Sequence, residues 1–159
     1  MLVAFALDES RYALHLFRVK RIVRVVTITP LPKAPEIVHG VINVQGQVIP
    51  VFNTRKRFRL PEREIDLSDQ MIIATTSSRT VALVVDAVSG VVDHSEGEVI
   101  EPEDILPRME YVEGVVKLED GLVLIHDLDK FLSLDEEKEL TDALKAQQPV
   151  DTAQGPRNG

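Results

Sequence analysis

The sequence predicts an all-β protein built from two small β-barrels, with short helices and a C-terminal helix. Apolar residues make up 44% of the 159 residues but aromatic residues only 4%, so Val, Ile and Leu must fill most of the core. Branched side chains of this kind suit the half-buried surface of a strand. In addition, a strand-turn-strand pattern occurs twice along the chain, each time with a turn that contains Gly.

The repeat is clearest between residues 40–53 and residues 114–127, which lie 74 positions apart. Each copy contains an apolar strand, a tight turn and a second apolar strand. Asn53 and Asp127 then occupy equivalent places, where either side chain is able to accept a backbone N–H at the start of a helix. Short helices are expected after these caps, at about residues 54–58 and 128–133.

Turn chemistry supports the same interpretation. Asp120-Gly121 is a favoured hairpin signal, because both central residues of such a turn must tolerate positive φ. Gln45-Gly46 is a weaker version of this signal in the first copy. Both copies are therefore expected to close as β-hairpins.

A second, weaker similarity lies upstream of each hairpin, between residues 12–14 and residues 81–83. It predicts that each copy begins with another strand pair and continues through a Pro-containing connection, at 29–35 in the first copy and 102–107 in the second. A unit of about five short strands cannot form a stable open sheet with exposed edges. Closure of each unit into a small barrel is the simplest solution.

These units predict a single domain over residues 1–134, made of two β-barrel subdomains. The subdomains are expected at about residues 1–58 and 70–134, with exchange of strands between them left open. A charged, Pro-containing connector over residues 59–69 joins them.

The end of the chain predicts a helix and a tail. Residues 133–136 have the spacing of a capping box, and Leu140 with Leu144 can give an apolar stripe. We therefore expect a C-terminal helix over residues 135–147 and a flexible tail over 148–159.

Composition narrows the classes of function. A net charge of −8 opposes a general role in binding nucleic acid, and the basic run at residues 55–59 is expected to be a solvated helix face. The absence of Cys fits a reducing compartment. The apolar start at residues 1–7 is too short for a signal peptide, and no apolar run is long enough to span a bilayer, so we expect a cytoplasmic protein without direct membrane insertion.

Motifs for catalysis are lacking. The sequence has no nucleophile elbow, no phosphate-binding Gly-rich loop and no dinucleotide fingerprint. None of His15, His39, His94 and His126 has a second His at metal-ligand spacing, so each is expected to be an ordinary strand or loop residue. We expect no enzyme activity, no metal and no cofactor, with a hydrolase that uses paired carboxylates as the open alternative.

The residues also resemble a known family. Residues 40–55 are similar to the CheW-like motif in which G-V-I-N-x-R-G is followed by a strand that ends in P-V-x-D-L-R. Residues 84–88 resemble the motif of the second half of the same family. The resemblance runs from Phe5 to about Leu134 and identifies the chain as similar to the chemotaxis coupling proteins.

This resemblance implies two SH3-like five-stranded barrels and no catalytic activity. It implies an adaptor that couples the cytoplasmic tip of methyl-accepting chemoreceptors to the regulatory domain of the chemotaxis histidine kinase. The receptor is expected in an apolar groove between the barrels, and the residues carried over to that groove are Val19, Gly40, Val85 and Val88. Val85 and Val88 also fit a core position, and we expect Gly40→Asp to impair docking more than folding.

The resemblance places the kinase on the outer strands of a barrel. The residues carried over to that surface are Arg21, Asn43, Gln45 and Arg55. This chain departs from the family at several of these places, because Gln45 stands where Arg is usual and Arg21 where Glu is frequent. We expect Arg21 and Gln45 to be neighbours and the pathway to be a divergent one with a co-adapted partner.

Two other hypotheses stay open. The first is a sensor that binds a small ligand in the groove between the barrels, which a preformed cavity with convergent polar groups would favour. The second is a fragment of a larger signalling protein. No receiver or kinase domain is present in these residues, so a stand-alone adaptor is the simpler expectation.

Overall fold

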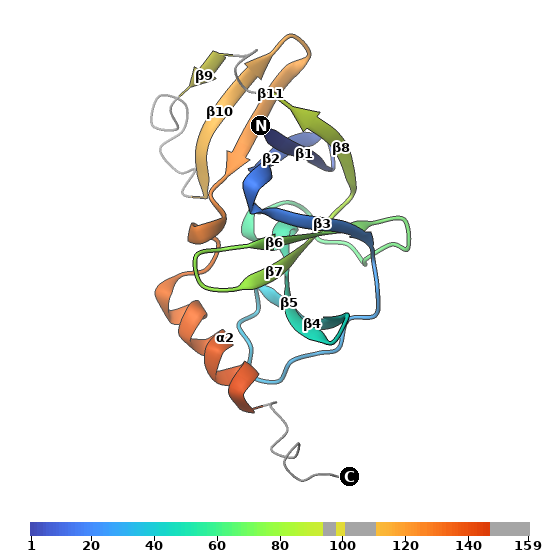
Figure 1. Ribbon diagram of the computed structural model, residues 1–159, viewed down its shortest axis with the longest axis vertical. Coiled ribbons are helices and arrows are strands. Elements are labelled where there is room, and N and C mark those ends of the chain that lie inside the picture. The colour runs from blue at the N-terminus through green and yellow to red at the C-terminus, as the bar shows by residue number, and fades with distance from the viewer. Residues whose placement is uncertain (94–97, 101–110, 147–159) are drawn as a thin grey trace.

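The computed structural model describes residues 1–93, 98–100 and 111–146 and is mostly β (Figure 1). Two mixed sheets carry the fold, with short helices and one C-terminal helix, as the sequence predicts. The expected tail, the second Pro-containing connection and His94 lie outside the described residues.

Each sheet draws its strands from both halves of the chain. Sheet A has the hydrogen-bonded order β8-β1-β2-β11-β10-β9, and sheet B has the order β3-β6-β7-β5-β4. The strands of sheet A are β1 (Leu2–Leu7), β2 (Ser10–His15), β8 (Ala87–Val92), β9 (Glu98–Ile100), β10 (Val112–Leu118) and β11 (Gly121–His126). The strands of sheet B are β3 (Val19–Arg24), β4 (Val38–Val44), β5 (Gln47–Phe52), β6 (Gln70–Thr75) and β7 (Thr80–Val85). The helices are the 3-10 turns η1 (Leu16–Arg18) and η4 (Leu128–Lys130), and the α-helices α1 (Thr54–Arg57) and α2 (Leu134–Ala146).

The repeat has the predicted spacing, since β10 and β11 begin and end 74 residues after β4 and β5. Gln45 and Gly46 have φ of 52° and 85°, which are the two positive values that a tight hairpin turn needs. In the second hairpin Glu119 and Asp120 occupy the turn instead, and Gly121 begins β11. Asn53 accepts a hydrogen bond from the Lys56 amide at the start of α1.

The two sheets do not correspond to the segments before and after the connector at residues 59–69, because each sheet contains strands from both segments. The hairpin β1–β2 joins β10 and β11 from the second half, through a parallel pair of β2 with β11. The hairpin β6–β7 joins β4 and β5 from the first half, through a parallel pair of β7 with β5. The two parallel pairs are equivalent, since Val51 lies opposite Ala82 and Ile125 opposite Ala13. The halves have therefore exchanged their first hairpins.

Apolar side chains form three buried clusters, because neighbouring residues of a strand point to opposite faces. One cluster contains Val51 and Ala82 inside sheet B, and another contains Ala13 and Ile125 inside sheet A. The largest cluster lies between the sheets and takes side chains from both of them. Its large members include Phe5, Leu14, Phe52, Phe131 and Leu140.

Helix α2 closes one end of this shared core. Its capping box is formed as predicted, because the Glu136 amide donates to Ser133 Oγ and the Ser133 amide donates to Glu136 Oε1. Leu140 and Ala143 are buried. Arg57 donates to both carboxylate oxygens of Glu136 and so ties α2 to α1.

His126 is buried at the end of β11 and is 2% exposed. Its ring packs edge-on against Phe58 and Phe131. In the part of the chain that the structure describes, neither ring nitrogen has a hydrogen-bond partner. Burial, together with the nearby Arg57 charge, lowers the pKa of His126 to about 3.

Gly40 lies at a bulge in β4, where the segment around Thr29 crosses. Thr29 and Val41 exchange two backbone hydrogen bonds of 2.8 Å beside it. A Cβ on Gly40 would overlap the Thr29 carbonyl oxygen, and the φ of 152° at Gly40 is one that L side chains rarely adopt. A substitution by Asp is therefore expected to cost folding stability as well, because any side chain here meets backbone; whether docking suffers more than folding stays a prediction.

We predict that Gly40→Ala lowers the free energy of unfolding by roughly 2–5 kcal/mol, from backbone strain and steric overlap together. Gly90→Ala is the matched control, because Gly90 also has positive φ, 133°, but no atom lies within 4 Å of the place that its Cβ would take. Urea unfolding of both variants measures the difference. Equal losses in the two variants would contradict the role given to the Thr29 contact.

We predict that His126→Phe increasingly stabilises the protein over the wild type as pH falls from 6.5 towards 3. In this range the unfolded imidazole binds a proton that the buried ring does not, so the wild type loses up to about 1.4 kcal/mol of stability per pH unit. Phe suits the site, since Phe52 occupies the equivalent place in the first copy. Urea unfolding at pH 7, 6 and 5 tests this, and a constant difference across pH would refute it.

Candidate docking surfaces

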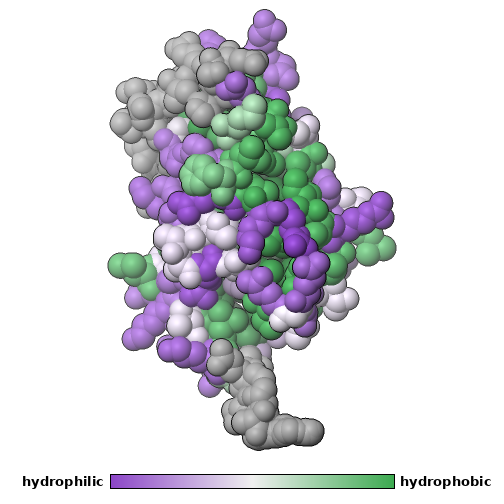
Figure 2. Space-filling view, in the orientation of Figure 1, coloured by the Kyte–Doolittle hydropathy of each residue, from purple (hydrophilic) through white to green (hydrophobic). Residues whose placement is uncertain are grey.

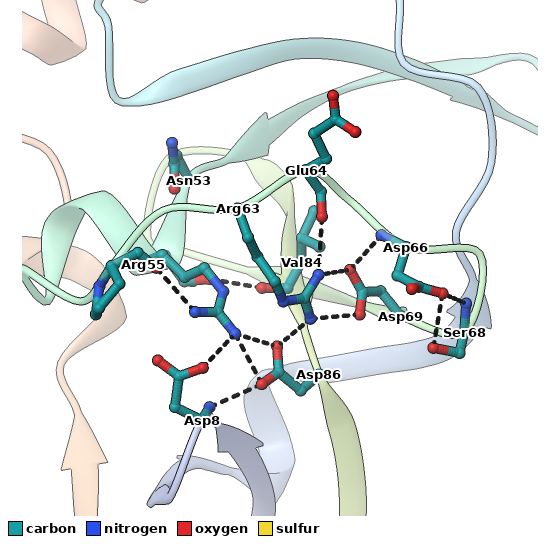
Figure 3. Close-up of polar contacts among 12 residues, drawn as sticks. Asp8, Asn53, Arg55, Arg63, Glu64, Asp66, Ser68, Asp69, Val84 and Asp86 are labelled. Atoms are coloured by element: carbon teal, nitrogen blue, oxygen red, sulfur yellow. Dashed lines mark hydrogen bonds and ion pairs between the residues drawn. The ribbon is translucent and has the colours of Figure 1, made fainter.

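An ion-pair network holds the two sheets together at their junction (Figure 3). Arg55 extends from α1 and donates through Nη2 to both oxygens of Asp86, at 2.7 and 2.8 Å. The same nitrogen lies 2.9 Å from a carboxylate oxygen of Asp8, which belongs to the β1–β2 turn. Nη1 of Arg55 donates to the Pro61 carbonyl. A helix next to sheet B is thereby joined to a hairpin of sheet A.

Arg63 extends this network into the connector (Figure 3). It donates to both oxygens of Asp69, at 2.8 and 3.0 Å, and to Asp86 at 2.7 Å. The Asp69 side chain is almost fully buried, and its carboxylate is paired with this guanidinium. The connector is thus fixed to the body of the protein at Arg63.

The groups of the network favour one another's charged forms. Hydrogen bonding to Asp8 raises the pKa of Arg55, with Asp86 adding to the effect, although burial opposes it. Burial acts to raise the pKa of Asp86, but the Asp8 amide and the Arg55 guanidinium outweigh it and the pKa is lowered. Asp86 is therefore ionised at neutral pH, and its contribution to stability is lost only as pH falls through this lowered pKa.

A second ion pair crosses the junction at the equivalent place in the repeat. Asp129 lies 74 residues after Arg55, and it accepts from Arg18 Nη2 at 2.7 Å. Asp129 also accepts from the Ser77 amide in the β6–β7 turn. The two pairs have opposite polarity: the residue after the β4–β5 hairpin is the cation Arg55, and the equivalent residue after the β10–β11 hairpin is the anion Asp129. Neither pair was predicted from the sequence, although the 74-residue offset relates Arg55 to Asp129 and so relates one charged residue of each pair.

The expected receptor-groove residues differ in their exposure. Val19 begins β3 and Val88 lies in β8, and both side chains are half-buried against the shared core. Val85 is fully buried in that core, and Gly40 is buried beside Thr29. Only Val19 and Val88 of the four are therefore placed to contact a partner.

Exposed apolar side chains extend this pair of valines. Ile22 on β3 is 40% exposed and Val91 on β8 is 57% exposed. On the face shown in Figure 2, apolar residues gather in a strip over the region where Figure 1 draws β8 and β3. We call Val19, Ile22, Val88 and Val91 the β3–β8 strip.

The expected kinase-surface residues fall into two groups. Arg21 on β3, Asn43 on β4 and Gln45 in the β4–β5 turn are exposed. Asn43 accepts from the Gly46 amide and stabilises that turn. Arg55 is buried in the junction network, which corrects its placement on an outer surface.

Arg21 and Gln45 lie at the two edges of sheet B in its hydrogen-bonded order. Within the described residues no hydrogen bond or ion pair joins them. Their expected proximity stays a prediction.

The basic run at residues 55–59 is not a solvated helix face throughout. Arg57 donates to Tyr111 and Glu136, and only 12% of its side chain is exposed. Together with the buried Arg55, this shows that half of the run serves internal contacts. The acidic partners lie too far away in sequence for a local charge pattern to reveal them.

Metal-binding clusters and membrane-spanning helices do not occur in the described part of the chain. Among residues 1–93, 98–100 and 111–146, no group of three or more His, Cys, Asp or Glu side chains is arranged to hold a metal ion. No helix in these ranges is long and apolar enough to cross a membrane.

Comparison with known proteins identifies the family. A family model described as the CheW-like domain matches residues 1–136. The chain is 30% identical over 145 residues to "Chemotaxis protein CheW" of Treponema pallidum, with 87% of this chain and 85% of that protein covered. It is 32% identical over 133 residues to the protein of the same name from Bacillus subtilis, with 82% and 85% covered. The crystal structure of scaffolding protein TtCheW from Thermoanaerobacter tengcongensis matches with a TM-score of 0.76 and 31% identity, over 85% of this chain and 93% of that one. The exchanged double sheet and these matches over nearly all of the described chain together establish that the protein belongs to the CheW-like family.

Proposed function

We propose that this protein is a non-enzymatic chemotaxis scaffold that couples chemoreceptors to a histidine kinase. Membership of the CheW-like family over residues 1–136 is the observation that carries the proposal. The solved relative is named a scaffolding protein, and the curated relatives are named chemotaxis proteins. The net charge of −8 supports a protein partner rather than nucleic acid, and the family implies the cytoplasm as the place of action.

The β3–β8 strip is the surface that we assign to the receptor tip. Its side chains are apolar and partly exposed, and a helical receptor hairpin can bury such a strip with an apolar face of its own. Asp86 and Arg18 precede β8 and β3 directly, so the junction ion pairs fix the backbone at the start of both strands. A docked receptor would thus contact a surface that is already ordered.

The β4–β5 hairpin is the surface that we assign to the kinase regulatory domain. Asn43 and Gln45 are exposed on it, and the Asn43 side chain keeps the turn in one conformation. Gln45 is neutral where the family pattern usually has the cation Arg, and Arg21 is a cation where the family frequently has the anion Glu. We infer that the partner surface on the kinase of this pathway has changed in a complementary way.

A small-ligand sensor that uses the groove between the sheets stays the alternative. It predicts a ligand that binds the isolated protein at the β3–β8 strip. The coupling proposal predicts that both partners are recovered together from the source cell.

We predict that Ile22→Ser and Val91→Ser each weaken binding of a receptor cytoplasmic fragment by roughly 5- to 30-fold. The loss reflects about 1–2 kcal/mol of apolar burial at the interface, while the exposed positions leave the unfolding midpoint nearly unchanged. Val48→Ser is the control, because Val48 is as exposed as Val91 but lies on β5, outside the strip. Calorimetric titration measures all three. The assignment fails if Val48→Ser weakens binding equally.

We also predict that Arg21 and Gln45 are coupled. If the two residues are neighbours, Gln45→Arg alone places two cations together and lowers the free energy of unfolding by about 0.2–1 kcal/mol, and Arg21→Glu in the same chain restores it. A double-mutant cycle on urea unfolding isolates the coupling. The same variants are titrated against a kinase regulatory domain from a conventional pathway, where the double variant should bind best. Purely additive effects on stability would show that the two residues are not neighbours.

A further inference from the structure

The two copies of the repeat hold cavities at equivalent places, and the cavity of the second copy is the larger of the two. The cavity of the first copy has a volume of about 20 Å³, and the cavity of the second has about 140 Å³. Lining residues of the first cavity include His39, Asn53 and Thr54. The residues 74 positions later, Glu113, Asp127 and Leu128, line the second.

The first cavity is filled by the chain's own connector. Glu62 and Arg63 line it, and the Asn53 amide donates to Glu62 Oε1 at 3.0 Å. Arg63 brings its guanidinium to Asp69 and Asp86 on the same wall. In the second copy the chain turns from η4 directly into α2, and among the described residues no segment equivalent to the connector lines the corresponding space. The second cavity therefore has lining residues at the same positions of the repeat as the first, but no counterpart of Glu62 and Arg63 among the described residues.

Polar groups that have unused hydrogen-bonding capacity within the described residues line the second cavity. His126 is almost fully buried, and within the described chain neither of its nitrogens has a partner, which is costly for a buried polar group. The adjacent Asp127 carboxylate makes no capping bond to η4, and its nearest cation, Lys130, is 4.0 Å away. Because the His126 ring stays neutral when buried, one of its nitrogens is always available as an acceptor.

The charge around the cavity favours a cation. Glu113, which a bulge in β10 sets apart from the ladder, lines the cavity and contacts His15. Arg18 is the one Lys or Arg among the lining residues, and its guanidinium is already bound to Asp129. Among the lining residues the carboxylates of Glu113 and Asp127 outnumber the one guanidinium, although Lys130 lies 4.0 Å from Asp127.

Shape and apolar surface favour a planar cation on a short stem. Leu14 and Leu128 supply apolar wall, and the 77% exposed Phe17 also lines the cavity, with its ring stacked on His15 and 5.4 Å from Arg18 Cζ. An aromatic face attracts a guanidinium, and carboxylates bind it through two parallel N–H bonds. The volume is close to that of a cavity that accepts a single six-membered ring.

We propose that the cavity between η1, β10 and η4 is a binding site for a guanidinium group, with Asp127 and His126 as its acceptors and Glu113 supplying further negative charge. In the first copy the counterpart of Asp127, Asn53, is instead bonded to Glu62 of the connector. The guanidinium group comes either from a free small molecule or from an arginine side chain of a protein partner. The site is independent of the proposed docking surfaces, because none of its lining residues belongs to the β3–β8 strip or the β4–β5 hairpin.

The test is a titration of the full chain with ethylguanidinium, followed by amide NMR shifts of residues 113 and 126–128. We expect saturation with a dissociation constant on the order of 1 mM, as for a fragment of this size, and at least about tenfold weaker binding of neutral ethylurea. Asp127→Asn should weaken ethylguanidinium binding about tenfold or more without changing the unfolding midpoint, since the carboxylate forms no cap. Glu119→Gln removes the same charge from an exposed turn and should have no effect.

Equal binding of ethylurea, unchanged binding by Asp127→Asn, or no saturable shift would each overturn the proposal. A second probe, the blocked tripeptide acetyl-Gly-Arg-Gly-amide, separates the sources. Binding of both probes supports an arginine side chain of a partner, and binding of ethylguanidinium alone supports a free small cation. Receptor and kinase titrations are unaffected by Asp127→Asn if the scaffold function is separate, so failure of one proposal is distinguishable from failure of the other.

Discussion

The exchange of hairpins between the halves of the chain determines where the rest of the structure lies. Each first hairpin is completed by strands that belong to the other half, through the parallel pairs of β2 with β11 and β5 with β7. The chain must therefore cross from one sheet to the other after β2 and again after β7. The largest apolar cluster forms between these crossings, and the edge strands β3 and β8 leave from them. Neither half is able to form its sheet alone.

Ion pairs stand at both crossings. Arg55 with Asp86 and Asp8 holds one, and Arg18 with Asp129 holds the other. Partly buried charges of this kind give little net stability, because the cost of removing them from water offsets most of their attraction. Removal of one partner is expensive, however, since it leaves the other charge buried. Their effect is therefore to penalise other placements of the two sheets, and this keeps the β3–β8 strip in one geometry.

The two copies of the repeat share a backbone but have diverged in chemistry. Phe52 stacks on Phe131 with ring centroids 4.3 Å apart, whereas His126, at the equivalent position, meets the same ring edge-on. The connector lines the small cavity beside the first hairpin, while the cavity beside the second is larger and no described residue of a connector lines it. A scaffold needs two unlike surfaces in order to hold unlike partners. An internal repeat with divergent side chains supplies such surfaces on one small body.

Local structure and family membership could be predicted before any coordinates were known. Strand periodicity, the caps at Asn53 and Ser133 and the CheW-like motif concern residues near one another in the chain, and the 74-residue offset compares two such local patterns. The structure has these features at the predicted positions. The hairpin that each sheet receives became clear only from the folded chain, because an alternating apolar pattern specifies a buried face but not the strand opposite it. The same holds for the burial of Arg55 with Asp8 and Asp86 and for the close approach of Gly40 to the Thr29 carbonyl. It holds also for the His126 nitrogens, which have no hydrogen-bond partner among the described residues. These contacts depend on segments distant in sequence, and long-range packing alone sets them.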